Sequence, residues 1–341
     1  MNRYAKQVNV NEFGEETQKL LSSATVAIVG CGALGTWQAE MLARMGVGAL
    51  RIADGDVASL DNLHRQILFS ERDAEEGVPK VAAAAARLAA VNSTVTVYPF
   101  AERVTRANIS AFIGEASLVL DATDHAATRF LINDFCVRKG LPWIYAGVAG
   151  VEGLVFPVVP PDGPCLRCLY PELPAEEETA TCAVSGILPT TVALAVSLQV
   201  TQALRILNGS VVPGTLLRLN AWDPVVRASA VRRVPGCPCC GGRRFDFLGN
   251  LRVEDAPLAT SVCSQKMIRI DARYWGGAFD SEQALAKAAA CGASVERKGL
   301  LWNLTHDARR ISLFPDGHML VHDCVVSEEA LSAVRALFGG A

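Results

Sequence analysis

The chain has little net charge of either sign, and this limits the partners that it can be expected to bind. Its 341 residues carry a formal net charge of -3 at pH 7, and its isoelectric point is near 6.0. Surfaces that bind nucleic acid or anionic membranes usually carry an excess of Lys and Arg. We therefore expect neither a nucleic acid nor a membrane as the partner.

The sequence also lacks a recognisable signal peptide and an unbroken membrane-spanning run. Residues 1–10 are polar, which favours a cytoplasmic protein whose 11 cysteines stay reduced or bind metal. The longest apolar run, 187–207, is interrupted by Pro189, Gln199 and Arg205. This run predicts a buried helix rather than a membrane span.

The first part of the chain alternates between short apolar strand-like runs and helical patterns. The strand-like runs are 25–29, 49–53, 94–99 and 118–121, and helical patterns follow them up to 45 and at 80–91, 107–113 and 126–139. This alternation predicts an α/β protein with a mostly parallel sheet, as in Rossmann-like nucleotide-binding folds. After residue 245, shorter runs predict a small α+β appendix. We therefore divide the chain into domains 1–245 and 246–341.

A glycine turn between the first strand and its helix is the first candidate site. Gly30, Gly32 and Gly35 have the G-x-G-x-x-G spacing of a dinucleotide or nucleotide fold, and Asp54 ends the second strand, where an acid can bind a ribose. An NAD-dependent oxidoreductase would show the same turn and the same acid. ATP would require additional cations and a metal ion for its phosphates. The basic residues Lys6, Arg65 and Lys80 and the acidic Asp124 could converge at the carboxyl ends of the strands, where ligands bind in such sheets.

Two C-x-x-C pairs form the second candidate site. Cys165 and Cys168 precede the long apolar run, and Cys237 and Cys240 follow it. Two thiolate pairs beside Pro and Gly predict one tetrahedral zinc that joins two distant segments of the C-terminal half of the first domain. A redox dithiol is the alternative for either pair alone.

Several motifs in one order make the sequence similar to a known family. They are R-Y-A-K-Q from residue 3, G-C-G-A-L-G from 30, D-G-D from 54, N-L-H-R-Q from 62, P-K from 79 and D-A-T-D from 121. With the cysteine pairs, they resemble the ThiF/MoeB/HesA family of ubiquitin-activating-enzyme-like adenylyltransferases over about residues 1–245. The resemblance implies that ATP adenylates the C-terminal Gly-Gly carboxylate of a small ubiquitin-like sulfur carrier. Thiocarboxylate formation for thiamine, molybdopterin or a related product would follow.

The resemblance also implies roles for individual residues. The glycines would lie beside the nucleotide, Asp54 would bind the ribose, Asp124 would hold Mg²⁺, and Asp56 would support them. The expected phosphate ligands are Asn62, Arg65, Gln66 and Lys80, and a backbone contact is expected at His125. Lys6 would reach the phosphates of the neighbouring subunit in a homodimer. It stands where the family usually has Arg, and so lacks the planar fork.

Cys182 follows an acidic segment at the position of a reactive cysteine in ThiF-like members. A thiolate there would accept the activated acyl group or a persulfide from a cysteine desulfurase or another sulfur donor. A dispensable thiol is the equal alternative. Other functions also remain open at this point: activation for protein conjugation, dehydration of a small carboxylate, an NAD-dependent oxidoreductase, or a binding module without catalysis.

Overall fold

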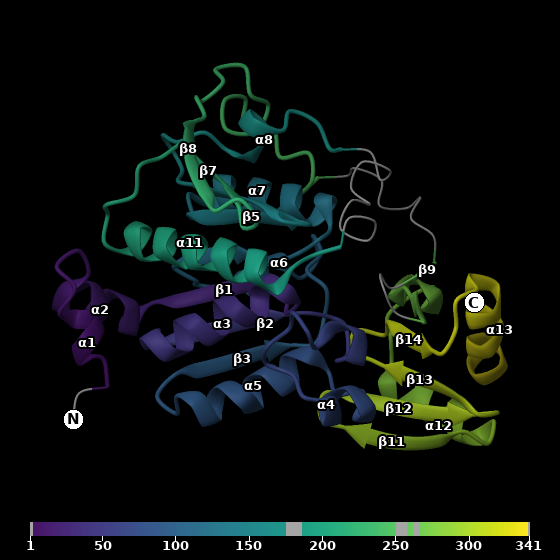
Figure 1. Cartoon of the computed structure of the whole chain (residues 1–341). Coiled ribbons are helices and arrows are strands. Elements are labelled where there is room, and N and C mark those ends of the chain that lie inside the picture. The colour runs from purple at the N-terminus through teal and green to yellow at the C-terminus, as the bar shows by residue number, and fades with distance from the viewer. Residues whose placement is uncertain (1–2, 175–185, 250–257, 262–265, 340–341) are drawn as a thin grey trace.

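Two β-sheets organise the chain (Figure 1). The computed structural model describes residues 3–174, 186–249, 258–261 and 266–339. Within these residues, the larger sheet has the order β3-β2-β1-β4-β5-β6-β7-β8, and the smaller has the order β11-β12-β13-β14-β10-β9.

The parallel half of the larger sheet is the Rossmann-like part. Its parallel strands are β1 (Thr25–Val29), β2 (Ala49–Ala53), β3 (Thr96–Phe100), β4 (Leu118–Asp121) and β5 (Trp143–Ala149). One face packs on α3 (Ala33–Met45), α5 (Lys80–Val91) and α11 (Pro189–Leu207), and the other on α6 (Ile109–Ile113) and α7 (Ala126–Lys139). The predicted alternation and its covering on both faces are therefore confirmed.

An antiparallel extension widens this sheet beyond β5. It consists of β6 (Glu152–Val158), β7 (Thr215–Asn220) and the edge strand β8 (Val225–Ala230). The short α8 (Leu166–Leu169) begins beside the first cysteine pair.

The apolar run at 187–207 forms a core helix, as predicted. By length and composition α11 could cross a membrane, but it packs against α3, β5 and β6 in the core. Its buried Gln199 donates hydrogen bonds of 3.0 Å to the carbonyl oxygens of Asp121 and Ile144. The polar residues in the run thus anchor the helix to the sheet.

Short helices surround the parallel sheet. They are α1 (Ala5–Val8), α2 (Gly14–Ser23), the 3-10 helix η1 (Leu60–Asn62) and α4 (Glu71–Glu76). Tyr4 fixes the N-terminal segment, because its hydroxyl accepts a hydrogen bond of 2.9 Å from Asn92 at the end of α5. It also packs against Gly46 at the end of α3.

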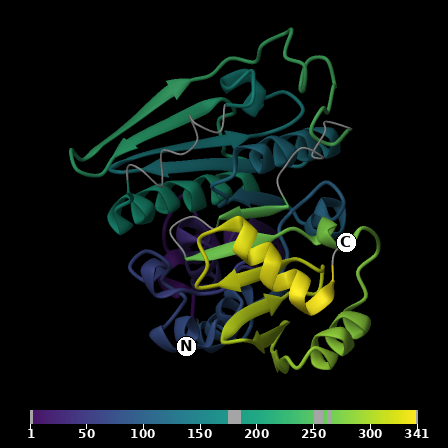
Figure 2. The same ribbon diagram turned by 90° about the vertical axis from the view of Figure 1, so that its right-hand side faces the viewer.

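The C-terminal unit, residues 258–261 and 266–339, is α+β as predicted. Its strands are β9 (Ala259–Ser261), β10 (Met267–Ile270), β11 (Ser294–Lys298), β12 (Leu301–His306), β13 (Arg309–Leu313) and β14 (Met319–His322). Its helices are η3 (Ala272–Trp275), α12 (Ser281–Ala290) and α13 (Ser327–Phe338), and Figure 2 shows α13 in yellow across the sheet.

The neighbouring strands β10 and β14 of the small sheet are buried on both faces. Ile268, Ile311 and Val321 pack in a core with α12 and α13. Met267, Phe314 and Leu320 join the core of the parallel sheet instead. The C-terminal unit therefore shares a hydrophobic core with the preceding part of the chain, and the domain boundary at residue 245 stays a prediction.

Candidate functional site

The glycine turn connects β1 to α3 and needs glycine for two different reasons. Gly30 has φ +101°, and a side chain there would lie 2.6 Å from the carbonyl oxygen of Ala122 after β4. A side chain at Gly35 would collide with the carbonyl of Gly30. At Gly32, by contrast, the nearest atom would be Nε2 of Gln66 at 3.9 Å. Packing within the protein does not require glycine at 32, so the open space suits a ligand that approaches the backbone.

Asp54, directly after β2, holds the glycine turn in place by a hydrogen bond. Its Oδ2 accepts a hydrogen bond of 2.7 Å from the backbone N–H of Cys31, and Oδ1 accepts one of 2.9 Å from Asp56. Burial and the neighbouring Asp56 carboxylate raise the pKa of Asp54, although Lys80 opposes them. Each carboxylate oxygen keeps a second lone pair, which a ribose hydroxyl can use.

Lys80 is a buried cation at the start of α5. Only 5% of the residue is exposed, and its Nζ lies 3.3 Å from Oδ2 of Asp56. Burial lowers the pKa of a lysine, but the carboxylates of Asp54 and Asp56 outweigh this effect and raise it. Lys80 is therefore charged at neutral pH and lies where the N-terminus of α5 also favours an anion.

Asp56 is the centre of a cluster of cations. Besides Lys80, Arg103 lies 3.5 Å and Arg269 3.8 Å from its Oδ1. Burial alone would raise the pKa of Asp56, but Lys80 and the two arginines hold it well below its usual range. The carboxylate is thus ionised, as expected for a residue that supports the phosphate ligands.

The N-L-H-R-Q segment lies in and after η1. Asn62 is buried, and its side-chain oxygen accepts a hydrogen bond from the Arg65 guanidinium. Arg65 also donates a bond of 3.0 Å to the carbonyl of Asp61. Among the described residues, the buried Oε1 of Gln66 has no hydrogen-bond partner, which is costly for a polar atom. The Nε2 of the same amide is the atom nearest to a side chain placed at Gly32, so this amide borders the open space there.

The segment after β4 brings Asp124 to the same edge of the sheet. Asp124 and His125 are exposed at the start of α7, and the backbone N–H of His125 is bonded to Oγ1 of Thr123. Behind them, the buried Asp121 accepts a bond of 3.1 Å from Nε of Arg129. Burial raises the pKa of Asp121 to about 6 despite this arginine.

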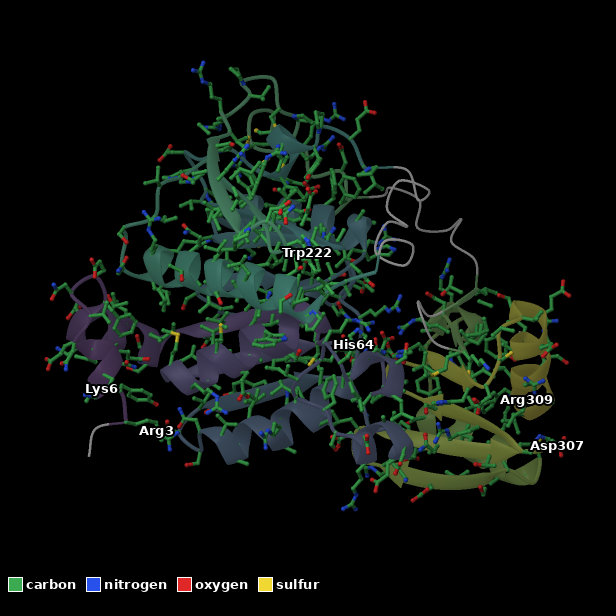
Figure 3. All side chains as sticks on the ribbon, viewed as in Figure 1. Arg3, Lys6, His64, Trp222, Asp307 and Arg309 are labelled. Atoms are coloured by element: carbon green, nitrogen blue, oxygen red, sulfur yellow. The ribbon has the colours of Figure 1, made fainter. Side chains whose placement is uncertain are left out.

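Two predicted site residues are not brought to this cluster. Lys6 is exposed on α1, beside the ends of α3 and α5 that lie farthest from the glycine turn, and Figure 3 shows it far from His64. Because α3 alone spans roughly 20 Å, Lys6 does not reach the site of its own chain. Cys182 lies outside the described residues, so its role stays a prediction.

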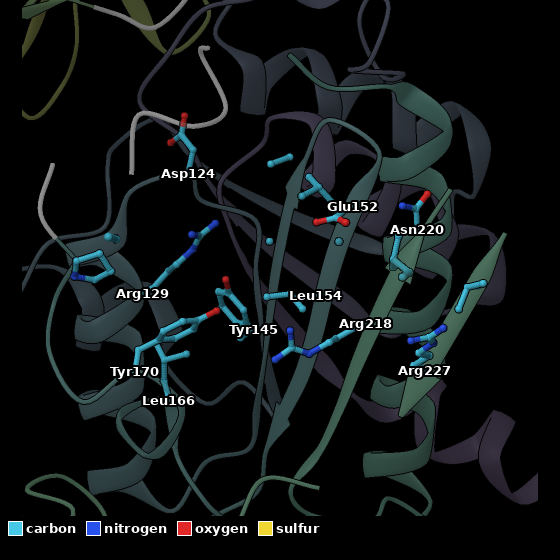
Figure 4. Close-up of a pocket in the computed structure, with 18 of the residues that line it drawn as sticks. Asp124, Arg129, Tyr145, Glu152, Leu154, Leu166, Tyr170, Arg218, Asn220 and Arg227 are labelled. Atoms are coloured by element: carbon cyan, nitrogen blue, oxygen red, sulfur yellow. The ribbon is translucent and has the colours of Figure 1, made fainter. Parts of the chain in front are cut away.

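A pocket of about 670 Å³ opens beside Asp124 over the antiparallel extension (Figure 4). Its floor is formed by strand residues that include Gly147 and Gly153, and a side chain at Gly147 would lie 2.7 Å from the Tyr145 hydroxyl. Arg129, Arg218 and Arg227 line it. Three carboxylates, those of Asp124, Glu152 and Asp223, line it as well, so the pocket carries charges of both signs and reaches the nucleotide residues at Asp124.

The cysteine pairs lie beside α7 and α8, on the face of the sheet that these two helices cover. The four Sγ atoms of Cys165, Cys168, Cys237 and Cys240 are all within 4.8 Å of one another. Across the two pairs, Sγ of Cys165 lies 3.6 Å from Sγ of Cys237, and Sγ of Cys168 lies 3.5 Å from Sγ of Cys240. Sulfurs around a tetrahedral zinc are about 3.8 Å apart, so the cluster fits that ion. Cys239 instead accepts a hydrogen bond from Asn133.

Two arginines of the cluster around Asp56 were missing from the sequence-based prediction. Arg103 follows β3, so the rule that ligands bind at the carboxyl ends of parallel strands could have identified it. Arg269 lies in the antiparallel sheet of the C-terminal unit, and no motif indicates its contact with Asp56.

Comparison with known proteins assigns the chain to a family. The pattern of the ThiF family matches residues 4–239. A sulfur carrier protein ThiS adenylyltransferase from Bacillus subtilis is 37% identical over 94% of this chain and 94% of its own length. The SAMP-activating enzyme E1 of Haloferax volcanii is 36% identical over 74% of this chain and 93% of its own length.

Solved structures agree in fold. The crystal structure of E. coli MccB with MccA-N7isoASN matches 70% of this chain and 74% of the MccB chain with a TM-score of 0.61, at 24% sequence identity. This likeness concerns the fold alone, whereas the family pattern and the B. subtilis relative extend over most of the sequence. The chain belongs to the ThiF family.

Proposed function

We propose that this protein is an ATP-dependent adenylyltransferase that activates the C-terminal Gly-Gly carboxylate of a small ubiquitin-like sulfur carrier protein. The carboxylate attacks the α-phosphate of ATP, and pyrophosphate leaves. One observation carries the proposal: Asp124 borders both the nucleotide cluster at the strand ends and the open pocket over the sheet. The names of the B. subtilis and H. volcanii relatives agree with this activity.

The nucleotide half of the site binds ATP through the glycine turn and the two following strand ends. Asp54 accepts hydrogen bonds from the ribose, and the bare backbone at Gly32 allows close approach. Asn62, Arg65, Gln66 and Lys80 bind the phosphates, and the two cations offset the charge that develops during attack. Mg²⁺ held at Asp124 would neutralise further phosphate charge. Catalysis then rests on placement and charge, because the described cluster holds no strong general base within it.

The carrier half of the site is the pocket over β5 to β8. Gly147 and Gly153 are among its lining residues, and Tyr145 and Leu219 fill the positions that their side chains would take. We place the extended Gly-Gly tail of the carrier over this part of the sheet, with its carboxylate toward Asp124. Arg129 lies next to Asp124 in this pocket and can steer a carboxylate toward the α-phosphate. The product acyl-adenylate is then available for thiocarboxylate formation, in thiamine or molybdopterin biosynthesis or a related route.

The remaining components of the proposal are a structural zinc, a second subunit and a sulfur donor. Zinc at the four cysteines would hold the two segments that flank α11. A homodimer would let Lys6 reach the partner's phosphates, which its distance from its own site favours. We also propose a cytoplasmic location and a cysteine desulfurase or other donor for the sulfur step.

ATP–pyrophosphate exchange tests the activation step. The full-length protein should catalyse exchange with a Gly-Gly carrier and should not do so with the same carrier lacking its last glycine. Asp124→Ala should abolish the exchange, whereas Cys182→Ala should preserve it because the thiol would act later. Exchange that persists in the Asp124 variant would contradict the assigned site.

A further inference from the structure

Two side chains of the C-terminal unit meet at one backbone carbonyl of the nucleotide site. This is the carbonyl of Gly55, which lies between Asp54 and Asp56 in the loop after β2. Nη1 of Arg269, on β10, donates a hydrogen bond of 3.1 Å to the oxygen. Nε2 of His318, before β14, lies 2.9 Å from the same oxygen and is the donor, because a carbonyl only accepts. Two side chains from a distant part of the sequence thus hold the loop.

Both donors are rigidly placed. Arg269 is 8% exposed and His318 is 1% exposed. The His318 ring stacks on Phe314 with centroids 4.0 Å apart, and its Nδ1 faces the carboxylate of Asp316. Phe314 in turn belongs to the core shared with the parallel sheet. The support therefore does not depend on a mobile surface side chain.

The loop packs closely against this support. A side chain at Gly55 would lie 3.0 Å from Nη1 of Arg269 and 3.1 Å from the backbone nitrogen of Arg103. The loop also carries the two hydrogen bonds by which Asp54 holds Cys31 and Asp56. A shift at Gly55 would consequently move the carboxylate that faces the ribose.

Arg269 also changes the charge balance around Lys80. Asp56 is paired with Lys80, Arg103 and Arg269, and only Lys80 starts a helix that faces the phosphates. If Lys80 turns from Asp56 to a phosphate, the two arginines keep the buried carboxylate compensated. Burial, with Arg103 nearby, lowers the pKa of Arg269 to about 10, which still leaves it charged at neutral pH. A buried charge without partners would be costly.

We propose that Arg269 and His318 are positioning residues for the nucleotide site, through which the C-terminal unit sets the affinity for ATP. Arg269 fixes the Asp54–Asp56 loop and keeps Asp56 paired, so that Lys80 is free to bind phosphate. His318 holds the same carbonyl from a second direction. This inference rests on the proposed function, since it requires ATP to bind at Asp54 and Lys80.

The test uses the full-length protein with Arg269→Met and Arg269→Lys, and with His318→Leu and His318→Gln. Arg309→Met is the matched control, because Arg309 pairs with Glu329 on the far side of the C-terminal unit (Figure 3). Titration calorimetry measures the Kd for ATP without carrier. Pyrophosphate exchange gives separate KM values for ATP and carrier, and thermal unfolding confirms that each variant is folded.

Arg269→Met should raise the Kd and the KM for ATP by about tenfold, as expected for loss of a charged hydrogen bond, and leave the KM for carrier unchanged. Arg269→Lys, which keeps the charge, should recover part of the loss. His318→Gln, which keeps an N–H donor, should bind ATP more tightly than His318→Leu, and Arg309→Met should match the wild type.

Unchanged ATP affinity in a folded Arg269→Met protein would overturn the inference, as would an equal rise of both KM values. If that variant does not fold, Arg269→Lys decides the question by the same criterion. The binding measurement also separates the two levels of proposal. A wild type that binds ATP but shows no carrier-dependent exchange would contradict the proposed function. The Kd values of the Arg269 variants would still test the role of Arg269 in ATP binding.

Discussion

At the scale of single residues, the site depends on charges that the fold has already buried and paired. Lys80 is the clearest case, because its buried ammonium group is paired with Asp56. A phosphate oxygen can take over this interaction without a further cost of desolvating the lysine. Charges that the fold has already placed are a main source of electrostatic catalysis.

Lys80→Met should lower the rate of pyrophosphate exchange by on the order of 10²-fold, because it removes one charged donor to the phosphates. Lys19→Met is the control, since Lys19 is an exposed lysine of α2 that pairs with Glu16. Steady-state exchange rates with saturating carrier measure the effect. A Lys80 variant as active as the Lys19 variant would exclude Lys80 from the phosphate site.

Asp121 predicts a pH dependence of stability. Its pKa is about 6 in the folded protein and 3.8 when unfolded, so the folded state binds the proton more tightly. The stabilising effect is full below pH 3.8 and is lost as the pH rises through 6, a change of about 3 kcal/mol at most. Denaturant unfolding of wild type and Asp121→Asn from pH 4 to 7 should therefore show the wild type losing stability relative to the variant. Parallel curves would rule out this titration.

Individual site residues could be predicted from the sequence where they belong to a local motif. Gly30, Asp54 and Lys80 each follow or precede a regular element within a few residues, so their positions follow from the strand order. The contact of Arg269 with Asp56 could not be predicted. It joins residues separated by most of the chain and depends on how the small sheet packs.

At the scale of elements, the buried strands agreed with the sequence-based prediction, whereas two exposed strands were not predicted. β1, β2 and β4 lie at the predicted residues because their short apolar runs reflect burial. β8 was not predicted, since every one of its residues is exposed and no apolar alternation marks it. β11 is largely exposed as well and was missed for the same reason. Edge strands are formed by backbone pairing with a neighbour, which the sequence does not display.

The cysteine cluster joins two segments of the chain, and removing it should measurably lower the stability of the protein. It belongs to the core formed with α7, so loss of zinc should weaken packing on that face. We expect one zinc per chain, lost together with several degrees of Tm in Cys237→Ser or after chelation. Cys239→Ser, which changes a neighbouring buried thiol outside the cluster, should keep its zinc. Metal analysis and thermal unfolding give the answer, and zinc retained in Cys237→Ser but lost in Cys239→Ser would reverse the assignment of ligands.

At the scale of the whole molecule, the position of Lys6 predicts a homodimer in which Lys6 of each subunit completes the ATP site of the other. Mixing Lys6→Met chains with Asp124→Ala chains should create heterodimers in which one site has both an intact Asp124 and the partner's Lys6. Random mixing should restore roughly a quarter of the wild-type exchange rate, although each variant alone is impaired. Size-exclusion chromatography verifies subunit exchange. A mixture no more active than the sum of its components would place Lys6 outside the catalytic site.

The central claim, that the protein transfers AMP from ATP to the C-terminal carboxylate of a Gly-Gly carrier, is tested most directly by intact mass spectrometry of the carrier. A single turnover with ATP, Mg²⁺ and zinc-loaded protein should give a carrier with the added mass of an adenylate. The adduct should be absent with Asp124→Ala and with a carrier that lacks its last glycine. Folded, zinc-loaded wild-type protein that forms no adduct and releases no pyrophosphate with any Gly-Gly carrier would contradict the account.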